Sequence, residues 1–168
     1  MDAVAFRDTI VKPALIILDQ WSVPAEMLIM GTAAQESWLR FTRQMGGGPA
    51  LGYFQMEPAT HDDCWTSYIN FRPSLRSKVL ATRTATNAPR AAEMATDHKY
   101  AAAMARIFYM RVPASIPASV TDIAAYWKLY YNTPLGAGTI GEFISNWNLL
   151  RNCSTHPSLC KRLINKAF

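Results

Sequence analysis

The chain of 168 residues is half hydrophobic and only 17% charged, which excludes a disordered protein and provides enough apolar surface for one folded domain. Its formal net charge of +5 favours anionic partners, such as nucleic acid or polymers that carry carboxylates and phosphates. The basic residues are scattered, apart from Arg72, Arg76, Lys78 and Arg83, and no basic helix carries interleaved aromatic residues. We interpret that cluster as a solvated helix face and predict no nucleic-acid partner.

The first predicted elements are two helices separated by a short break. Residues 2–20 are apolar at helical spacing, and Pro13 predicts a kink or a boundary among them. Pro24 suits the first position of the second helix. From there to Ala34 the sequence is apolar on nearly every side of the helix, which is typical of a helix in the interior of a domain.

The most informative residue, Glu36, follows in the last turn of this apolar helix. Desolvation and the negative end of the helix dipole both disfavour its ionisation. The sequence therefore predicts a carboxyl that keeps its proton near neutral pH and can donate it. The alternative is a solvated carboxylate that caps the helix or pairs with Arg40, four residues later.

A glycine-rich break comes next. Residues 45–49 include three glycines and a proline and cannot continue a helix, and residues 52–56 are short, aromatic and extended in character. Gln55 offers both a donor and an acceptor, which suits sugar hydroxyls or an acetamido group. The alternative is a simple turn whose Phe54 and Met56 fill the core.

The rest of the chain indicates helices joined by short breaks. Thr139 and Glu142 have the spacing of a capping box, which predicts the start of a helix. We found no strand alternation, repeat or linker, so the sequence predicts one all-α domain over residues 1–168. Its further helices are expected from Pro58, over 74–86, 89–112 and 117–131, from 139 to about 151, and from Pro157.

Three short motifs stand in a defined order: Glu36-Ser37, then Gly52–Thr60, then Ala124–Trp127 with Tyr130–Gly138. They resemble the catalytic domain of soluble lytic transglycosylases, which carries Glu-Ser, then Gly-Leu-Met-Gln and Ile-x-Pro-x-Thr, then Ala-Tyr-Asn-Ala-Gly. The resemblance covers roughly residues 24–147. It implies a lysozyme-like helical domain with a groove beside the catalytic helix.

The resemblance also implies roles for individual residues. Glu36 is the implied single acid/base, which cleaves the bond between N-acetylmuramic acid and N-acetylglucosamine in peptidoglycan and leaves a 1,6-anhydro ring. A tyrosine that orients this glutamate is either Tyr131 or Tyr126. The residues implied to support or bind the glycan are Ser37, Tyr53, Phe54, Gln55, Tyr126, Tyr131 and Asn132, of which Tyr53 and Phe54 replace the usual Leu-Met.

Two alternatives to this function stay open. A lysozyme-type hydrolase of the same bond needs a second carboxylate about 5 to 9.5 Å from the first, and Glu57, Asp62 and Asp63 are the nearby candidates. Goose-type lysozymes resemble the same family and have an additional aspartate in this region. The other alternative is a non-catalytic, wall-binding virion protein with a lysozyme-like fold.

The sequence predicts neither a cofactor nor a metal site. Cys153, His156 and Cys160 lack a fourth zinc ligand nearby, and a Cys153–Cys160 disulfide with Cys64 free is favoured over zinc. The N-terminus lacks the basic segment of a signal peptide, and its apolar run is too short to insert into a membrane. With a peptidoglycan substrate, these features favour a phage protein that is held in the virion or the host cytoplasm before release, acts in the periplasm or cell wall and contacts other virion proteins.

Overall fold

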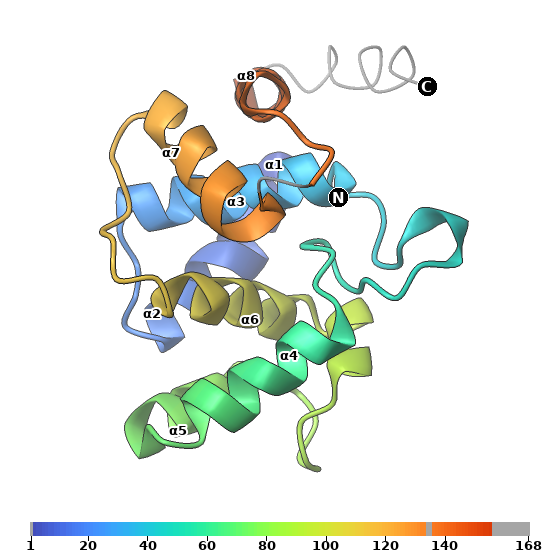
Figure 1. Cartoon of the computed structure of the whole chain (residues 1–168), viewed down its shortest axis with the longest axis vertical. Coiled ribbons are helices and arrows are strands. Elements are labelled where there is room, and N and C mark those ends of the chain that lie inside the picture. The colour runs from blue at the N-terminus through green and yellow to red at the C-terminus, as the bar shows by residue number, and fades with distance from the viewer. Residues whose placement is uncertain (1, 134–135, 156–168) are drawn as a thin grey trace.

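The computed structural model of the chain describes residues 2–133 and 136–155 (Figure 1). These residues form helices joined by short loops, and they contain no strand beyond isolated bridges. The predicted all-α class is therefore confirmed for the described part of the chain. The helix predicted from Pro157 and the predicted pairing of Cys153 with Cys160 lie outside the residues whose side chains are described.

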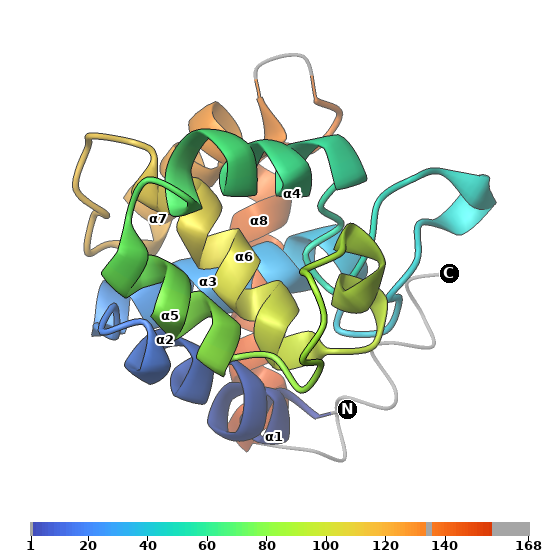
Figure 2. The same ribbon diagram turned by 90° about the horizontal axis from the view of Figure 1, so that it is seen from below.

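Helix α6 lies between α3 on one side and the α4–α5 pair on the other, while α7 and α8 cover the opposite side of α3 (Figures 1 and 2). The elements in chain order are α1 (Ala3–Phe6), η1 (Arg7–Val11), α2 (Lys12–Ile17), α3 (Val23–Ser37), η2 (Met45–Gly47), α4 (Pro58–Cys64), η3 (Trp65–Ile69), α5 (Pro73–Ala81), η4 (Ala91–Ala95), α6 (His98–Met110), α7 (Val120–Trp127), η5 (Lys128–Asn132) and α8 (Ile140–Thr155).

The first three elements form one continuous helix that runs through Pro13. Asp2 caps its start, because its carboxylate accepts a hydrogen bond from an amide of the first turn at 2.8 Å. Proline has no amide hydrogen, and the helix widens just before it into the π-helical turn η1, where the Lys12 amide donates to the Arg7 carbonyl. The kink or boundary predicted at Pro13 is thus a wider turn within an unbroken helix.

The middle turns of helix α3 are buried, as the apolar sequence predicts. Ser22 caps its start, and Trp38 ends it in the left-handed conformation with φ of 56°. Gly31 permits the close approach of α8, because a Cβ at this position would lie 2.3 Å from the ring of Phe143. The end of α3 is therefore enclosed by neighbouring helices.

The prediction of a single helix over residues 89–112 is wrong for the first third of that range. The 3-10 turn η4 ends before Asp97, and Asp97 starts α6 by accepting a hydrogen bond from the Tyr100 amide at 3.1 Å. The helix predicted over 74–86 is also too long, since α5 ends at Ala81. Both differences reflect side-chain caps and ion pairs that a pattern of apolar residues does not report.

The capping box at the start of α8 is confirmed. The Thr139 amide donates to Glu142 Oε2 at 2.7 Å, and the Glu142 amide donates to Thr139 Oγ1 at 3.2 Å. Among the described helices, none combines the length and the apolar character that a membrane span requires.

Candidate active site

Glu36 lies in the last turn of α3 with its carboxyl largely buried. Its Oε1 accepts a hydrogen bond from Trp127 Nε1–H at 3.0 Å. Burial raises the pKa of Glu36 from 4.5 to about 7, and the bond from Trp127, which favours the ionised form, lowers it in part. Near neutral pH this carboxyl can therefore either give or take a proton, as the sequence predicts, and it is not a solvated cap.

Trp127 fixes the orientation of this carboxyl. Its side chain is fully buried at the end of α7, and its ring packs against Phe143 of α8 with centroids 5.3 Å apart. The following loop closes over it at Gly138, where a Cβ would lie 2.7 Å from the indole. The sequence pattern gave Trp127 as part of the third motif and did not predict this contact. The available signal was that a buried indole N–H and a buried carboxyl each need a partner.

The turn after α3 is held next to Glu36 by the buried hydroxyl of Ser37. Ser37 Oγ lies 2.7 Å from the carbonyl oxygen of Tyr53 and 3.1 Å from that of Ala33, within hydrogen-bonding distance of both. The turn itself requires a left-handed residue at Gly52, with φ of 71°, where a Cβ would meet a backbone carbonyl oxygen at 2.7 Å. Ser37 thus supports the local fold, but it is too deeply buried to touch a sugar.

Gln55 stabilises the same turn from its outer side. Its Nε2 donates to the Gly52 carbonyl at 2.8 Å and lies 3.5 Å from the Phe41 carbonyl, so the amide nitrogen is directed inward. Because both of these neighbours are carbonyl acceptors, the atom of the Gln55 side-chain amide that faces them is the nitrogen. Gln55 is only partly buried, and its Oε1 bonds to no other described residue, which leaves an acceptor for a ligand hydroxyl.

Tyr131 joins this turn to the end of α7. Its hydroxyl donates to the Phe54 carbonyl at 2.8 Å, and its ring stacks on Tyr109 with centroids 5.2 Å apart. Burial is the main cause that raises the pKa of Tyr131, and the negative charge of ionised Glu36 is the second. The Tyr131 hydroxyl and the Glu36 carboxyl are therefore close enough to interact electrostatically. Tyr126 is directed elsewhere, since its hydroxyl donates to the Ala114 carbonyl at 3.0 Å. Of the two tyrosines considered, Tyr131 is the one beside Glu36.

Four of the seven residues expected to support or bind the glycan belong to the core. Tyr53 packs edge-on against Phe6, and Phe54 is 1% exposed. Together with Ser37 and Tyr126 they are buried, so they offer little surface to a sugar. The structure thus places Tyr53 and Phe54 in the core, and the burial of Phe54 agrees with the alternative in which it fills the core.

Asn132 ends the π-helical turn η5 and serves as an anchor for the next loop. Its Oδ1 accepts from Lys128 Nζ at 2.8 Å, and the same ammonium donates to the Gly136 carbonyl at 2.7 Å. Asn132 is only partly buried, and its Nδ2 lies 3.3 Å from where a Cβ on Gly138 would be. The motif after α7 therefore positions the loop that covers Trp127.

The candidate second carboxylates of a hydrolase are engaged in other contacts or exposed. Asp63 accepts from Arg111 at 2.6 Å, and hydrogen bonds from Ser67 and then Arg111 lower its pKa. Asp62 contacts the neighbouring histidine ring at 2.7 Å, and Glu57 is exposed just before α4. In the described part of the chain, none of the three carboxylates is hydrogen-bonded to Glu36.

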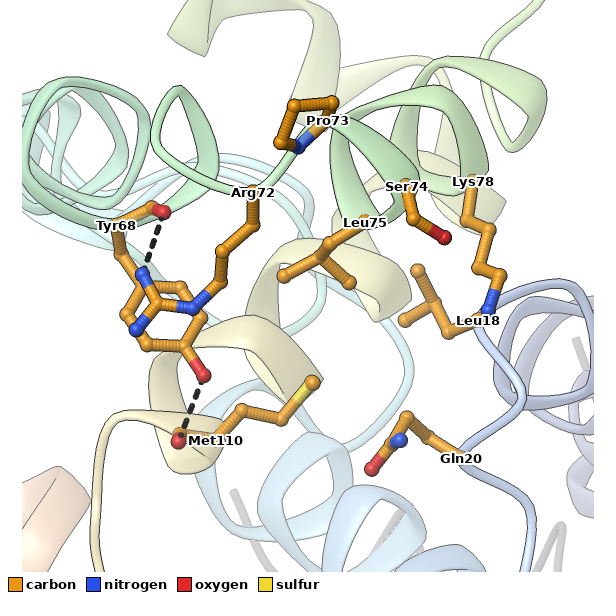
Figure 3. Close-up of a pocket in the computed structure, with 9 residues that line it drawn as sticks. All are labelled: Leu18, Gln20, Tyr68, Arg72, Pro73, Ser74, Leu75, Lys78 and Met110. Atoms are coloured by element: carbon orange, nitrogen blue, oxygen red, sulfur yellow. Dashed lines mark hydrogen bonds between the residues drawn. The ribbon is translucent and has the colours of Figure 1, made fainter.

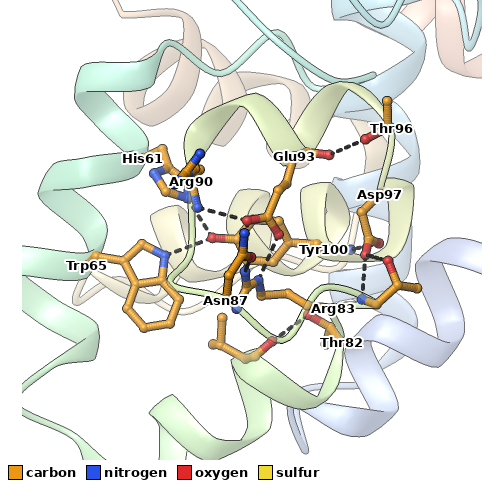
Figure 4. Close-up of polar contacts among 12 residues, drawn as sticks. His61, Trp65, Thr82, Arg83, Asn87, Arg90, Glu93, Thr96, Asp97 and Tyr100 are labelled. Carbon is orange, nitrogen blue, oxygen red and sulfur yellow. Dashed lines mark hydrogen bonds and ion pairs between the residues drawn. The ribbon is translucent and has the colours of Figure 1, made fainter.

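A second polar cluster, between α4, α5 and α6, is structural (Figure 4). The Tyr100 hydroxyl accepts from Trp65 Nε1–H at 2.8 Å and lies 2.6 Å from His61 Nε2. Beside it, Arg83 donates to both oxygens of Glu93 at 2.7 and 2.9 Å. His61 and Tyr100 are fully buried and satisfy each other, so this cluster fixes the packing of the helices.

The predicted solvated basic face is only partly correct. Arg72 and Arg76 are exposed, whereas the Arg83 side chain is 1% exposed within its ion pair and Lys78 pairs with Asp19 at 2.6 Å. The four residues therefore do not form one continuous basic surface.

No protein-family model, curated protein or solved structure matches this chain. The likeness to lytic transglycosylases therefore rests on the motifs, and the chemistry of the site rests on its geometry. Among the described residues, no group of three or more His, Cys, Asp or Glu side chains is placed to hold a metal ion.

Proposed function

We propose that this protein is a lytic transglycosylase of peptidoglycan, with Glu36 as its single acid/base. The observation that carries the proposal is the oriented, largely buried carboxyl with a pKa of about 7, hydrogen-bonded through one oxygen to Trp127. A carboxyl with these properties suits a reaction that needs an acid first and a base afterwards.

The proposed reaction proceeds in two proton transfers. In the neutral carboxyl, Oε1 accepts the hydrogen bond from Trp127, so the proton is on Oε2. Oε2 gives this proton to the glycosidic oxygen while the bond between that oxygen and the muramyl C1 breaks. The resulting carboxylate takes the proton of the muramyl 6-hydroxyl, whose oxygen bonds to C1 and closes the 1,6-anhydro ring. No water is consumed, and the carboxyl ends protonated as it began. The indole N–H stabilises the carboxylate between these steps.

The surroundings of Glu36 suggest how the glycan is held. Gln55 Oε1 supplies an acceptor that bonds to no other described residue, while Ser37 and Tyr131 fix the turn that presents it. The net charge of +5 favours association with the anionic wall. The site of action is then the periplasm or cell wall, and a phage virion or the cytoplasm of an infected host is the proposed compartment before release.

The test compares the wild-type protein with Glu36→Gln and Glu57→Gln. Wild type and Glu57→Gln are expected to reduce the turbidity of bacterial cells whose outer membrane has been permeabilised, and Glu36→Gln is expected to be inactive. Mass spectrometry of the released muropeptides should show species one water lighter than reducing sugars. Reducing ends would identify a hydrolase instead. Equal inactivity of wild type and Glu36→Gln, with both retained on isolated walls, would identify a binding protein.

A further inference from the structure

A cavity of about 400 Å³, open to solvent, lies between the end of α2, η3, α5 and the end of α6, and Glu36 is not among its lining residues (Figure 3). Its apolar part consists of Leu18, Leu75 and Met110, together with the ring of Tyr68. This volume suits a small ligand, and the apolar side chains suit a ligand with a small hydrocarbon portion.

Arg72 forms one wall of this cavity. Its guanidinium stacks on the ring of Tyr68 at 3.7 Å from the centroid, and Nη1 donates to the Tyr68 carbonyl at 2.8 Å (Figure 3). These two contacts hold the planar group in place. Its other N–H groups have no acceptor among the described residues, so they remain as ordered donors for a ligand.

Gln20 provides a second donor on the opposite wall. Its Oε1 accepts from Arg106 Nη2 at 2.9 Å, which directs its Nε2 away from that arginine. Arg106 itself is largely buried, its Nε has no hydrogen-bond partner, and no carboxylate pairs with it among the described residues. A cation in this state is poorly compensated, and it places positive potential behind Gln20.

The charge balance of this region is positive. Lys78 lines the cavity and pairs with the exposed Asp19 at 2.6 Å, whereas Arg72 and Arg106 have no acidic partner in the described structure. The cavity lining includes no carboxylate. The charged side chains of the lining are therefore cations beside an apolar floor, which is the complement of an anion with an apolar body.

We propose that this cavity binds the carboxylate of a small apolar acid, of the kind found at the C-terminus of a peptide that ends in an apolar residue. A carboxylate can accept from the N–H groups of Arg72 that are not bonded to Tyr68, and the hydrocarbon part would rest on Leu18 and Leu75. The site is independent of Glu36 and of the proposed glycosidic reaction.

The test is an NMR titration of the protein with N-acetyl-alanyl-alanine, with its C-terminal amide and with propionate. Saturable shifts of the Leu75 and Lys78 amides are expected with the free carboxylates and not with the amide. Tighter binding of the dipeptide than of propionate identifies a peptide C-terminus as the ligand, and equal binding identifies free short-chain acids. Equal binding of the amide, or no saturable shift with any probe, overturns the proposal.

Two variants and one matched control assign the site. Arg72→Ala is expected to weaken binding about tenfold, the loss typical of one charge-assisted hydrogen bond. Gln20→Glu places a carboxylate beside Arg106, so it should abolish binding and raise the melting temperature. Arg76→Ala removes an exposed cation from the same helix outside this cavity and should bind as wild type does. An equal loss in Arg76→Ala would show that net charge alone attracts the probe and would overturn the site.

Discussion

The bond between Trp127 and Glu36 allows a direct test of how the carboxyl keeps its proton. Trp127→Phe removes the indole N–H and keeps an aromatic ring against Phe143. Because that bond lowers the pKa of Glu36, its loss should raise the pKa further above about 7. A hydrogen bond to a charged group contributes about 1.5–3 kcal/mol. Without the indole N–H, the ionised form of Glu36 therefore loses more stabilisation than the neutral form does. At 1.36 kcal/mol per tenfold change, the expected rise is about one pH unit.

Two measurements follow this change. The carboxyl ¹³C shift of Glu36, recorded against pH, reports the pKa whether or not the protein is an enzyme. If Glu36 acts as the acid, the alkaline limb of the lytic rate should move upward by the same amount. Trp65→Phe is the matched control, since it removes another buried indole donor, the one to Tyr100, and should leave the titration of Glu36 unchanged. An unchanged midpoint in Trp127→Phe would refute the assigned role of this bond.

Three further predictions concern the same region. Between pH 4.5 and about 7 the folded state holds the Glu36 proton and the unfolded chain does not. The free energy of unfolding should therefore fall by at most about 3 kcal/mol as the pH rises across this range. Urea denaturation should show that Glu36→Gln removes this pH dependence. Tyr131→Phe leaves the Phe54 carbonyl without its donor and should cost about 1–2 kcal/mol in the same assay, so an unchanged midpoint would contradict the contact. Gly52→Ala combines a φ of 71° with a Cβ 2.7 Å from the Met94 carbonyl oxygen and should lower stability by more than about 1 kcal/mol, and a thermal melt equal to wild type would exclude this turn geometry.

The features that depend on neighbours in the sequence were predictable. The apolar run of α3 indicates a buried helix, and burial alone predicts a raised pKa for a carboxyl at its end, as found for Glu36. The capping box of Thr139 and Glu142 is likewise a local pattern and is confirmed. These predictions needed no knowledge of how distant segments meet.

The partner of Glu36 could not be predicted, because it depends on how distant segments pack. Trp127 is 91 positions away along the chain, and no local pattern connects the two residues. The error over residues 89–112 has a similar origin. Helical propensity favours residues 91–97, but Asp97 also accepts hydrogen bonds from Thr84, on the preceding loop, which stabilises the break before α6.

Two partly buried glutamates of this protein show what separates a structural carboxylate from one suited to proton transfer. Glu93 is 16% exposed and is paired with Arg83 through two hydrogen bonds, so its charge is compensated and it stabilises the fold as an anion. Glu36 has a neutral indole as its hydrogen-bond partner, and burial raises its pKa to about 7. A cation in that position would stabilise the anion and remove the proton that the first step requires. The use of an indole rather than an arginine beside Glu36 therefore agrees with the proposed reaction, which needs both protonation states. Trp127→Arg should abolish the proposed acid catalysis in a variant that still folds.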